Sequence, residues 1–136
     1  MDAIEIVGSA IYWCEGTKHR RRERNGKVFD RSSDVEVVNT DLQIIKLFLK
    51  YLRHLGCDER KLRARLCLFG EMDENAEKEF WSKETGIPPN QFGKSTHRLR
   101  KGFRTRKLEH AIMTVRYYDV KIRRRIDSMI GALTLI

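Results

Sequence analysis

The chain has 136 residues, of which 40% are hydrophobic and 35% charged, and its formal net charge is +9. This length suits one domain with a modest core, and the absence of any long apolar run excludes a membrane-spanning protein. The excess of positive charge favours a polyanionic partner, most simply nucleic acid, over an acidic membrane surface.

The first predicted element is a helix over residues 2–15, where apolar side chains recur at helical spacing. Three small residues follow one another in its middle and lower its helix propensity. They allow another backbone to approach closely, which predicts either tight packing within one core or contact between two copies. On the second interpretation the dimer contacts are Val7, Gly8, Ser9, Ala10 and Ile11.

Residues 17–33 form the next segment, which is polar and contains seven lysines and arginines. The Asn25-Gly26 pair is typical of a hairpin turn, so we expect a short charged hairpin or a loop. A charge run is usually only a solvated surface. If this segment contacts nucleic acid, the contact residues are Lys18, Arg20, Arg21, Arg22 and Arg24.

A strand is expected over residues 35–39, which are rich in β-branched side chains. Thr40 or Asp41 then caps a helix that runs to residue 55 and ends before Gly56. Residues 61–69 alternate with period two, which predicts a strand with leucines on one face and Arg63 and Arg65 on the other.

The second half of the chain begins with a predicted helix over residues 74–85, which a glycine and two prolines end. Residues 85–108 contain no carboxylate but many lysines and arginines, and part of this stretch alternates as a strand does. A strand over residues 111–118 and a final helix capped by Asp119 complete the chain. We expect the three arginines at residues 123–125 on the outside of that helix.

Together these elements predict one α+β domain over residues 1–136, with helices on one face of an antiparallel-leaning sheet. The other face is expected to be basic and nearly free of acids. Such a face can neutralise DNA phosphates and read guanine edges, although a polar sheet face is often merely solvated. The expected DNA contacts from this region are Asn39, Arg63, Arg65, Lys94, Thr96, Arg98, Arg100, Lys101, Arg104 and Arg106.

Glu15 is the last residue of the predicted first helix, in the stretch GSAIYWCEG. A carboxylate at a helix C-terminus lies beside the negative end of the helix dipole, so it is either solvated or binds a cation. If the first helices of two copies pair, two Glu15 carboxylates and nearby carbonyls converge into a pocket suited to Mg²⁺. Divalent ions there could activate water beside a phosphodiester.

Patterns typical of other enzymes are missing from the sequence. It contains no GxSxG, Walker or HExxH motif, and its four histidines show no ligand spacing. Its three cysteines form no CxxC pair, which fits a reducing compartment rather than a disulfide framework or a structural zinc site. Because the N-terminus lacks a signal-peptide pattern, we expect a cytoplasmic protein.

The stretch GSAIYWCEG resembles the LAGLIDADG motif of homing endonucleases. Ser9 and Ala10 stand at the small helix-packing positions of that motif, Glu15 at its metal-binding acid and Gly16 at its final glycine. A glycine and a tryptophan replace the motif's leucine and its first aspartate. The segments VVNTDLQIIKLFLKYL and FWSKETGIPPNQF also resemble small LAGLIDADG-like microbial proteins, and the order of predicted elements is similar to that fold.

This resemblance implies a LAGLIDADG-like fold whose N-terminal motif helix lies at a dimer interface. It implies a metal-dependent endonuclease that cuts a long pseudo-palindromic DNA duplex as a homodimer, with Glu15 as catalytic residue and with Mg²⁺ or Mn²⁺ at Glu15 and Gly16. Lys94 is a second catalytic candidate, chosen for its charge and its expected strand position.

Two alternatives stay open. The same scaffold can act as a non-catalytic, sequence-specific DNA-binding regulator, and the lack of assignable auxiliary residues favours this alternative. The retained Glu15-Gly16 pair favours the nuclease. RNA binding is not separated from DNA binding by the sequence.

Overall fold

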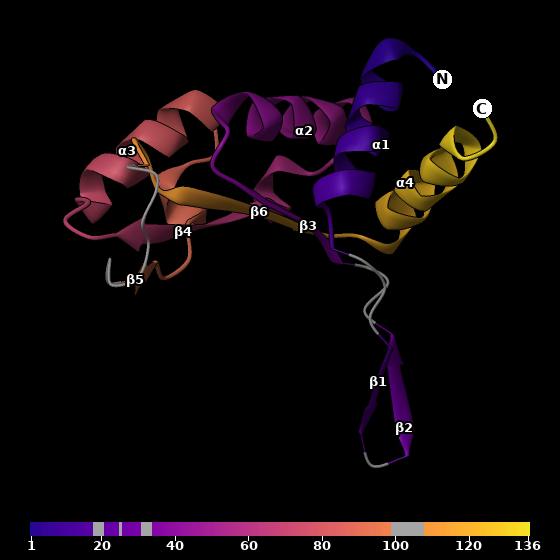
Figure 1. Ribbon diagram of the computed structural model, residues 1–136, viewed down its shortest axis with the longest axis horizontal. Helices are drawn as coiled ribbons and strands as arrows, with labels where there is room; N and C mark the ends of the chain where they lie inside the picture. Colours follow the sequence, from indigo (N-terminus) through magenta and orange to yellow (C-terminus); the bar gives the residue numbers. More distant parts are fainter. Residues whose placement is uncertain (18–20, 25, 31–33, 99–107) are drawn as a thin grey trace.

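The computed structural model describes residues 1–17, 21–24, 26–30, 34–98 and 108–136 (Figure 1). None of the helices in these ranges has the length and apolar character needed to cross a membrane. In chain order the elements are α1 (Ala3–Glu15), β1 (Arg21–Arg24), β2 (Lys27–Asp30), β3 (Asp34–Asn39), α2 (Leu42–His54), β4 (Arg63–Phe69), α3 (Glu74–Thr85), β5 (Thr96–Arg98), β6 (Ile112–Tyr118) and α4 (Val120–Leu133).

An aspartate begins each of these four α-helices. Its carboxylate accepts a hydrogen bond from a backbone N–H of the first turn, which would otherwise lack a partner. These bonds are 2.8–3.1 Å long, and they place the helix starts where the sequence predicts them. The capping residues are Asp2, Asp41, Asp73 and Asp119.

The main sheet has the strand order β3-β6-β4-β5. Strands β3, β6 and β4 are antiparallel neighbours, as predicted, but β5 runs parallel to β4. The reason lies in their connection, because α3 carries the chain back along the sheet before β5 begins. The sheet is therefore mixed, and its fourth strand is described over three residues only.

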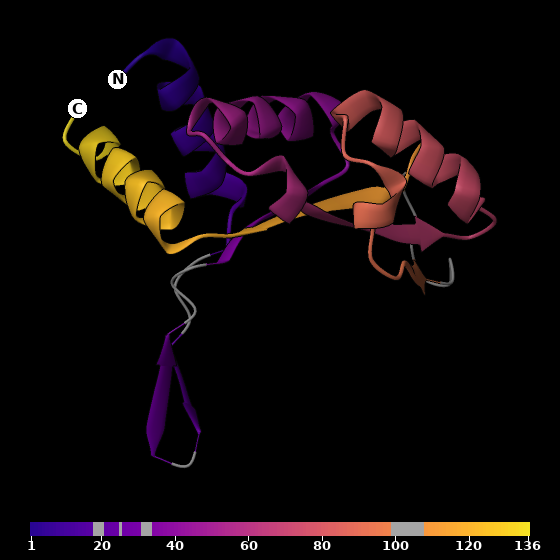
Figure 2. The ribbon, with the colours of Figure 1, turned by 180° about the vertical axis from the view of Figure 1, so that it is seen from behind.

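Helices cover one face of this sheet (Figures 1 and 2). Alternate strand residues point into the core on that side, where Val37, Leu66 and Val115 are all at most 1% exposed. Phe48 of α2 and Trp81 of α3 belong to the same buried cluster. Burial of this apolar surface is the main stabilising contribution to the fold.

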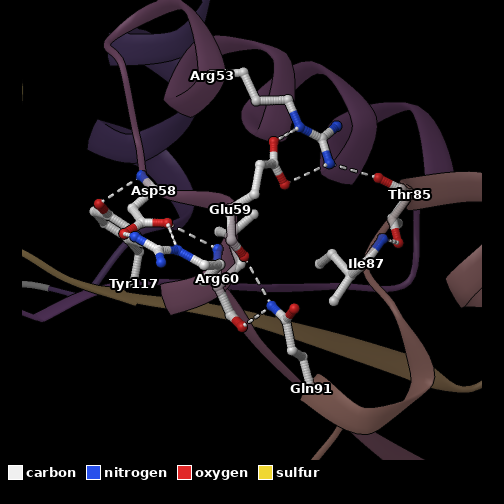
Figure 3. Close-up of polar contacts among 9 residues, drawn as sticks. Arg53, Asp58, Glu59, Arg60, Thr85, Ile87, Gln91 and Tyr117 are labelled. Carbon is white, nitrogen blue, oxygen red and sulfur yellow. Dashed lines mark hydrogen bonds and ion pairs between the residues drawn. The ribbon is translucent and has the colours of Figure 1, made fainter.

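A short connection between α2 and β4 ties three elements together (Figure 3). Arg53 of α2 pairs with Glu59 and also donates to the carbonyl of Thr85 at the end of α3, at 2.8 Å. Gln91 donates to the carbonyls of Glu59 and Leu62, at 2.8 and 2.7 Å. These bonds hold the residues before β4 and so set which β4 side chains face away from the helices.

The charged segment after α1 contains the predicted hairpin. Strands β1 and β2 pair antiparallel, with Arg24 opposite Lys27. Gly26 has a φ of 74°, a left-handed conformation that glycine adopts without strain. The hairpin projects from the side of the main sheet opposite α2 (Figures 1 and 2).

The last helix differs from the prediction at one arginine. Arg124 and Arg125 are exposed, whereas Arg123 is only 2% exposed and lies in the core. Its guanidinium contacts Tyr12 of α1 and the backbone carbonyl of Asp34 in β3. The apolar stripe of α4 did not reveal this burial, because the polar groups that pair with the arginine come from distant segments.

Candidate nucleic-acid interface

The face of the main sheet that points away from the helices is called the open face below. In the strand register, Arg116 of β6 lies between Glu36 of β3 and Arg63 of β4, and Thr114 lies beside Arg65. The open face of the three antiparallel strands consists of Asp34, Glu36, Val38, Arg63, Arg65, Cys67, Phe69, Ile112, Thr114, Arg116 and Tyr118, and Thr96 and Arg98 of β5 extend it.

Positive charge is distributed unevenly over the open face, which corrects the expectation that acids are nearly absent from it. Asp34 and Glu36 lie on the edge strand β3, and an Asp34 carboxylate oxygen is 3.2 Å from the Arg116 guanidinium. Arg63 bends toward the backbone and donates to the carbonyls of residues 60 and 62. Arg65 and Arg98 are exposed, so the basic part of the face lies over β4 and β5.

With the exception of Asn39, the predicted DNA contacts fall into three groups. Arg63, Arg65, Thr96 and Arg98 lie on the open face, with Lys94 exposed just before β5. Arg21, Arg22 and Arg24 belong to strand β1 of the hairpin. The remaining predicted contacts lie outside the described residues; they are Lys18, Arg20, Arg100, Lys101, Arg104 and Arg106.

Asn39 is placed differently from the expectation. It pairs with Met113, a buried residue, and so belongs to the helix-facing register of β3. Its side-chain oxygen accepts a 2.8 Å hydrogen bond from the N–H of Asp41, the residue that caps α2. Asn39 thus shapes the turn between β3 and α2, and it does not share the open face.

Glu15 and Gly16 stand where α1 meets the sheet. Gly16 forms an antiparallel bridge with Val37 of β3, and its N–H donates to the Tyr12 carbonyl at 2.8 Å. A Cβ at residue 16 would lie 2.4 Å from two carbons of the Tyr12 ring, so glycine permits this close approach. Glu15 is exposed, and the C-terminal end of α1 faces the side from which the hairpin projects (Figure 1).

Lys94 and Glu15 do not meet within one chain. Glu15 lies beside β3, at one edge of the sheet, whereas Lys94 precedes β5 at the other edge. Three strand spacings of about 4.8 Å separate these edges. The two catalytic candidates can share a site only if a second copy brings its own residue to the first.

The first helix has one buried and one exposed apolar side. Gly8 and Ser9 are buried, and a Cβ at Gly8 would lie 2.0 Å from Cγ of Tyr51 in α2. These two predicted dimer contacts therefore pack within the chain, which corrects their assignment. Ile11 is partly buried against the same core.

The opposite side of α1 is largely exposed and contains the remaining predicted contacts, Val7 and Ala10. At 100° per residue, small side chains recur along it at positions 3, 7, 10 and 14. Ile6, Val7 and Trp13 are 42%, 41% and 45% exposed. This side, called the outer face of α1, consists of Ala3, Ile6, Val7, Ala10, Trp13 and Cys14.

A different set of residues has the composition of a metal site. Among the described residues, one group of three ligand-type side chains lies within 4.8 Å, and it comprises Asp2, Glu5 and His54. His54 Nε2 is 3.3 Å from Asp2 and 3.5 Å from Glu5. The Glu5 backbone N–H, which bonds to the Asp2 carboxylate, is the main cause that lowers the pKa of Asp2. Contacts between the start of α1 and the end of α2 account for this cluster, which lies at the opposite end of α1 from Glu15.

A cavity of about 260 Å³ lies between α2 and α3, on the helix-covered side of the sheet. Two of its cationic side chains are already paired, Lys46 with Glu84 at 3.5 Å and Arg53 with Glu59. The cavity is therefore separate from the open face and offers little unpaired positive charge to an anionic ligand.

Sequence reasoning missed two contributors to this region. Arg116 reaches the open face from β6, and period-two alternation with the buried Val115 and Tyr117 was the available signal. Arg123 was assigned to the surface, and no local pattern marks its burial.

A comparison of the sequence with protein-family models and with curated proteins finds no match.

Proposed function

We propose that this chain is a DNA-binding protein of the LAGLIDADG type that pairs with a second copy through the outer face of α1. The open face and the hairpin contact the duplex, and Glu15 of each copy holds Mg²⁺ or Mn²⁺ for phosphodiester hydrolysis. The observation that carries the proposal is the coincidence of a basic sheet face, a projecting basic hairpin and an exposed acid at the end of α1.

Charge and shape support the DNA-binding part. Exposed Arg65 and Arg98 lie on a sheet surface that no helix of the described residues covers, and β1 adds three arginines on the side where the hairpin projects. Contacts of this kind neutralise phosphates and release counterions, which makes affinity depend on salt. A two-stranded β-ribbon also fits the major groove, where arginine forks can read guanine.

The outer face of α1 supports the dimer. A row of small side chains lets two helices approach within about 8–10 Å, and exposed apolar surface of this kind favours an interface. In a two-fold arrangement each residue meets its own copy near the axis. The two Glu15 carboxylates then approach each other at the helix ends, where a divalent cation offsets their repulsion.

Binding without cleavage is the second candidate. It is favoured by the separation of Lys94 from Glu15, because the two catalytic candidates lie at opposite edges of the sheet within one chain. A LAGLIDADG-type scaffold with this arrangement can recognise DNA as a regulator and leave the phosphodiester intact.

Cleavage assays with Glu15→Gln separate the two candidates. The wild-type protein is incubated with Mg²⁺ or Mn²⁺ and a randomised DNA duplex library, and strand breaks and bound duplexes are sequenced. The nuclease predicts breaks that fall at least about a hundredfold in Glu15→Gln while binding persists, because the metal supplies several kcal/mol of transition-state stabilisation. Glu79→Gln, an exposed change on α3, is the matched control and should cut like wild type.

Duplex retention without breaks would support the regulator. Absence of any duplex binding at low salt, in a chain that is folded by circular dichroism, would refute both candidates. An RNA duplex and a single-stranded RNA of the same base composition are tested in parallel, and tighter binding to either would replace DNA as the substrate.

A further inference from the structure

Thr17 is the last described residue of the body of the protein before the hairpin, and Asp34 is the first described residue after it. Just inside these points, the Thr17 N–H donates to the Glu36 carbonyl at 3.0 Å, and Gly16 bridges Val37. The pair formed by Thr17 and Asp34 is called the hairpin root below. Side chains of two helices that do not belong to the hairpin contact both of its residues.

Tyr12 of α1 reaches the root from one side. Its ring is fully buried and stacks on Phe48 of α2, with ring centroids 5.9 Å apart. Its hydroxyl donates to the Thr17 carbonyl at 2.8 Å and lies 3.1 Å from the Thr17 hydroxyl and 3.4 Å from the Asp34 carbonyl. Burial is the main cause that raises the pKa of Tyr12, so the hydroxyl keeps its proton at neutral pH.

Arg123 of α4 completes the arrangement. One guanidinium nitrogen donates both to the Tyr12 hydroxyl and, at 2.6 Å, to the Asp34 carbonyl. The guanidinium carbon lies 4.9 Å from the centre of the Tyr12 ring, which adds a cation–π contact. Asp127, one turn further along α4, accepts from Arg123 Nε at 3.2 Å and balances its charge. The two hydrogen bonds of the Tyr12 hydroxyl are compatible, because the hydroxyl oxygen accepts from Arg123 and its proton is donated to the Thr17 carbonyl.

A buried arginine is costly unless its hydrogen bonds are satisfied, and apolar residues usually fill such places. Here the guanidinium binds the backbone of Asp34 directly and reaches that of Thr17 through Tyr12. A role in holding Tyr12 and Asp34 together therefore explains why an arginine is buried at residue 123.

We propose that Arg123, acting through Tyr12, is a positioning residue that fastens both residues of the hairpin root, Thr17 and Asp34, to α1 and α4. This inference rests on the proposed function for its biological meaning, because the hairpin is there part of the DNA interface. Fastening the root limits the directions in which the hairpin leaves the sheet. The protein then pays less ordering entropy when the hairpin and the open face contact one duplex together.

Hydrogen exchange tests the inference without any nucleic acid. The variants are Arg123→Met, which removes the guanidinium at similar volume, and Tyr12→Phe, which removes only the hydroxyl. The Thr17 amide should exchange about tenfold faster in either variant, whereas amides of β4 and β6 keep wild-type protection. Arg124→Met is the matched control, because it removes the same charge from an exposed neighbour, and it should leave exchange at Thr17 unchanged.

Spin labels provide the second measurement. Labels at Lys27→Cys in β2 and Glu79→Cys in α3, in a chain whose three native cysteines are serine, report how the hairpin sits relative to the body. The distance distribution should broaden in Arg123→Met and Tyr12→Phe and narrow again in Arg123→Lys, which restores a donor. If Arg123→Met does not fold, Tyr12→Phe alone decides the question.

Unchanged exchange at Thr17 and an unchanged distance distribution in Tyr12→Phe would overturn the inference. Equal acceleration at all amides would also overturn it, because it would show general destabilisation. DNA affinity is measured last, and it should fall about tenfold in the variants with a loosened root. If wild type binds no nucleic acid, the proposed function fails, but exchange and distances still decide the role of Arg123.

Discussion

At the scale of single residues, the glycine in the middle of α1 is explained by its neighbour. Gly8 faces Tyr51 of α2, whose ring carbons occupy the space of any side chain at residue 8. The helix therefore accepts the propensity cost of glycine, about 1 kcal/mol, in return for close contact between α1 and α2.

Gly8→Ala should destabilise the protein by about 1–3 kcal/mol, because the new methyl group overlaps Tyr51 and forces it to move. Urea unfolding followed by circular dichroism measures this change. Gly131→Ala is the control, since residue 131 lies in α4 with open space around it and should gain about 0.4–1 kcal/mol. A Gly8→Ala variant as stable as wild type would contradict the close packing of α1 against α2.

We expect the Cys57 thiol to make the free energy of unfolding depend on pH in the alkaline range. Burial, followed by the nearby Glu59 carboxylate, raises the pKa of this thiol from its ordinary value of 9.0 to about 11. A group whose pKa is raised by folding contributes its full stabilisation below the unfolded value and loses it as pH rises toward the folded value. Unfolding free energy should therefore fall between pH 9 and 11.

Urea unfolding at half-unit steps from pH 8 to 11 checks this prediction, with Cys57→Ser as the comparison. The serine variant should show a smaller decrease than wild type over pH 9–10. Above that range both proteins lose stability, because burial also raises the pKa values of Tyr12 and Tyr51. Identical pH profiles for the two proteins would rule out a contribution from the thiol.

At the scale of elements, α1 joins three structures at once. Its buried side packs on α2 and α4, its last turn meets β3 at Gly16, and its outer face is largely exposed. The sequence prediction placed the dimer contacts on five consecutive residues, 7–11. Packing separates them, because neighbouring residues on a helix point about 100° apart.

Ala10→Glu should convert the proposed dimer into a monomer without unfolding the chain, because it places a charge in the middle of the outer face of α1. Sedimentation equilibrium at several concentrations measures the change. Asn75→Glu, an exposed substitution in the first turn of α3, is the control and should leave the mass unaltered. A wild-type protein that is monomeric at all concentrations would contradict this assignment.

Cys14 offers a second test of the same interface. It is exposed on the outer face of α1, whereas Cys57 and Cys67 are partly buried. A mild oxidant should link two wild-type chains through Cys14 if the helices pair there, since a disulfide requires Cα atoms within about 7 Å. Cys14→Ser should stay unlinked on a non-reducing gel, and cross-linking that persists in this variant would point to another contact.

At the scale of the whole molecule, the helix layer and the open face differ in charge pattern. Asp34 of β3 pairs with Arg116, and the exposed Arg65 and Arg98 lie on β4 and β5. A net charge of +9 gives the chain a positive field, but the sheet decides where a polyanion can approach it closely.

Arg65→Ala should weaken duplex binding at every sequence and reduce the slope of log affinity against log salt by about 1, because one phosphate contact is lost. Fluorescence anisotropy with a labelled duplex between 50 and 200 mM salt, a range in which phosphate contacts dominate, gives both values. Lys83→Ala removes one charge from α3, on the helix side, and should leave the slope unchanged. An equal slope change in both variants would indicate attraction by net charge alone.

The sequence by itself determined the described helices, the hairpin turn and the antiparallel strands. Those signals are local, because an aspartate cap, a glycine turn or a two-residue alternation acts within a few residues. The exposed acid at the end of α1 and the arginines of β4 were also identified in this way. Their partners and their chemistry stay predictions.

Only the tertiary structure decided which residues meet. The parallel direction of β5, the turn role of Asn39, the acids beside Arg116 and the burial of Arg123 all depend on contacts between segments far apart in the chain. The residues next to Arg123 in the sequence predict an exposed side chain. Arg123 is buried because Tyr12 and the Asp34 carbonyl lie where α4 packs. A polar group is accommodated inside a protein only when folding brings its hydrogen-bond partners to it.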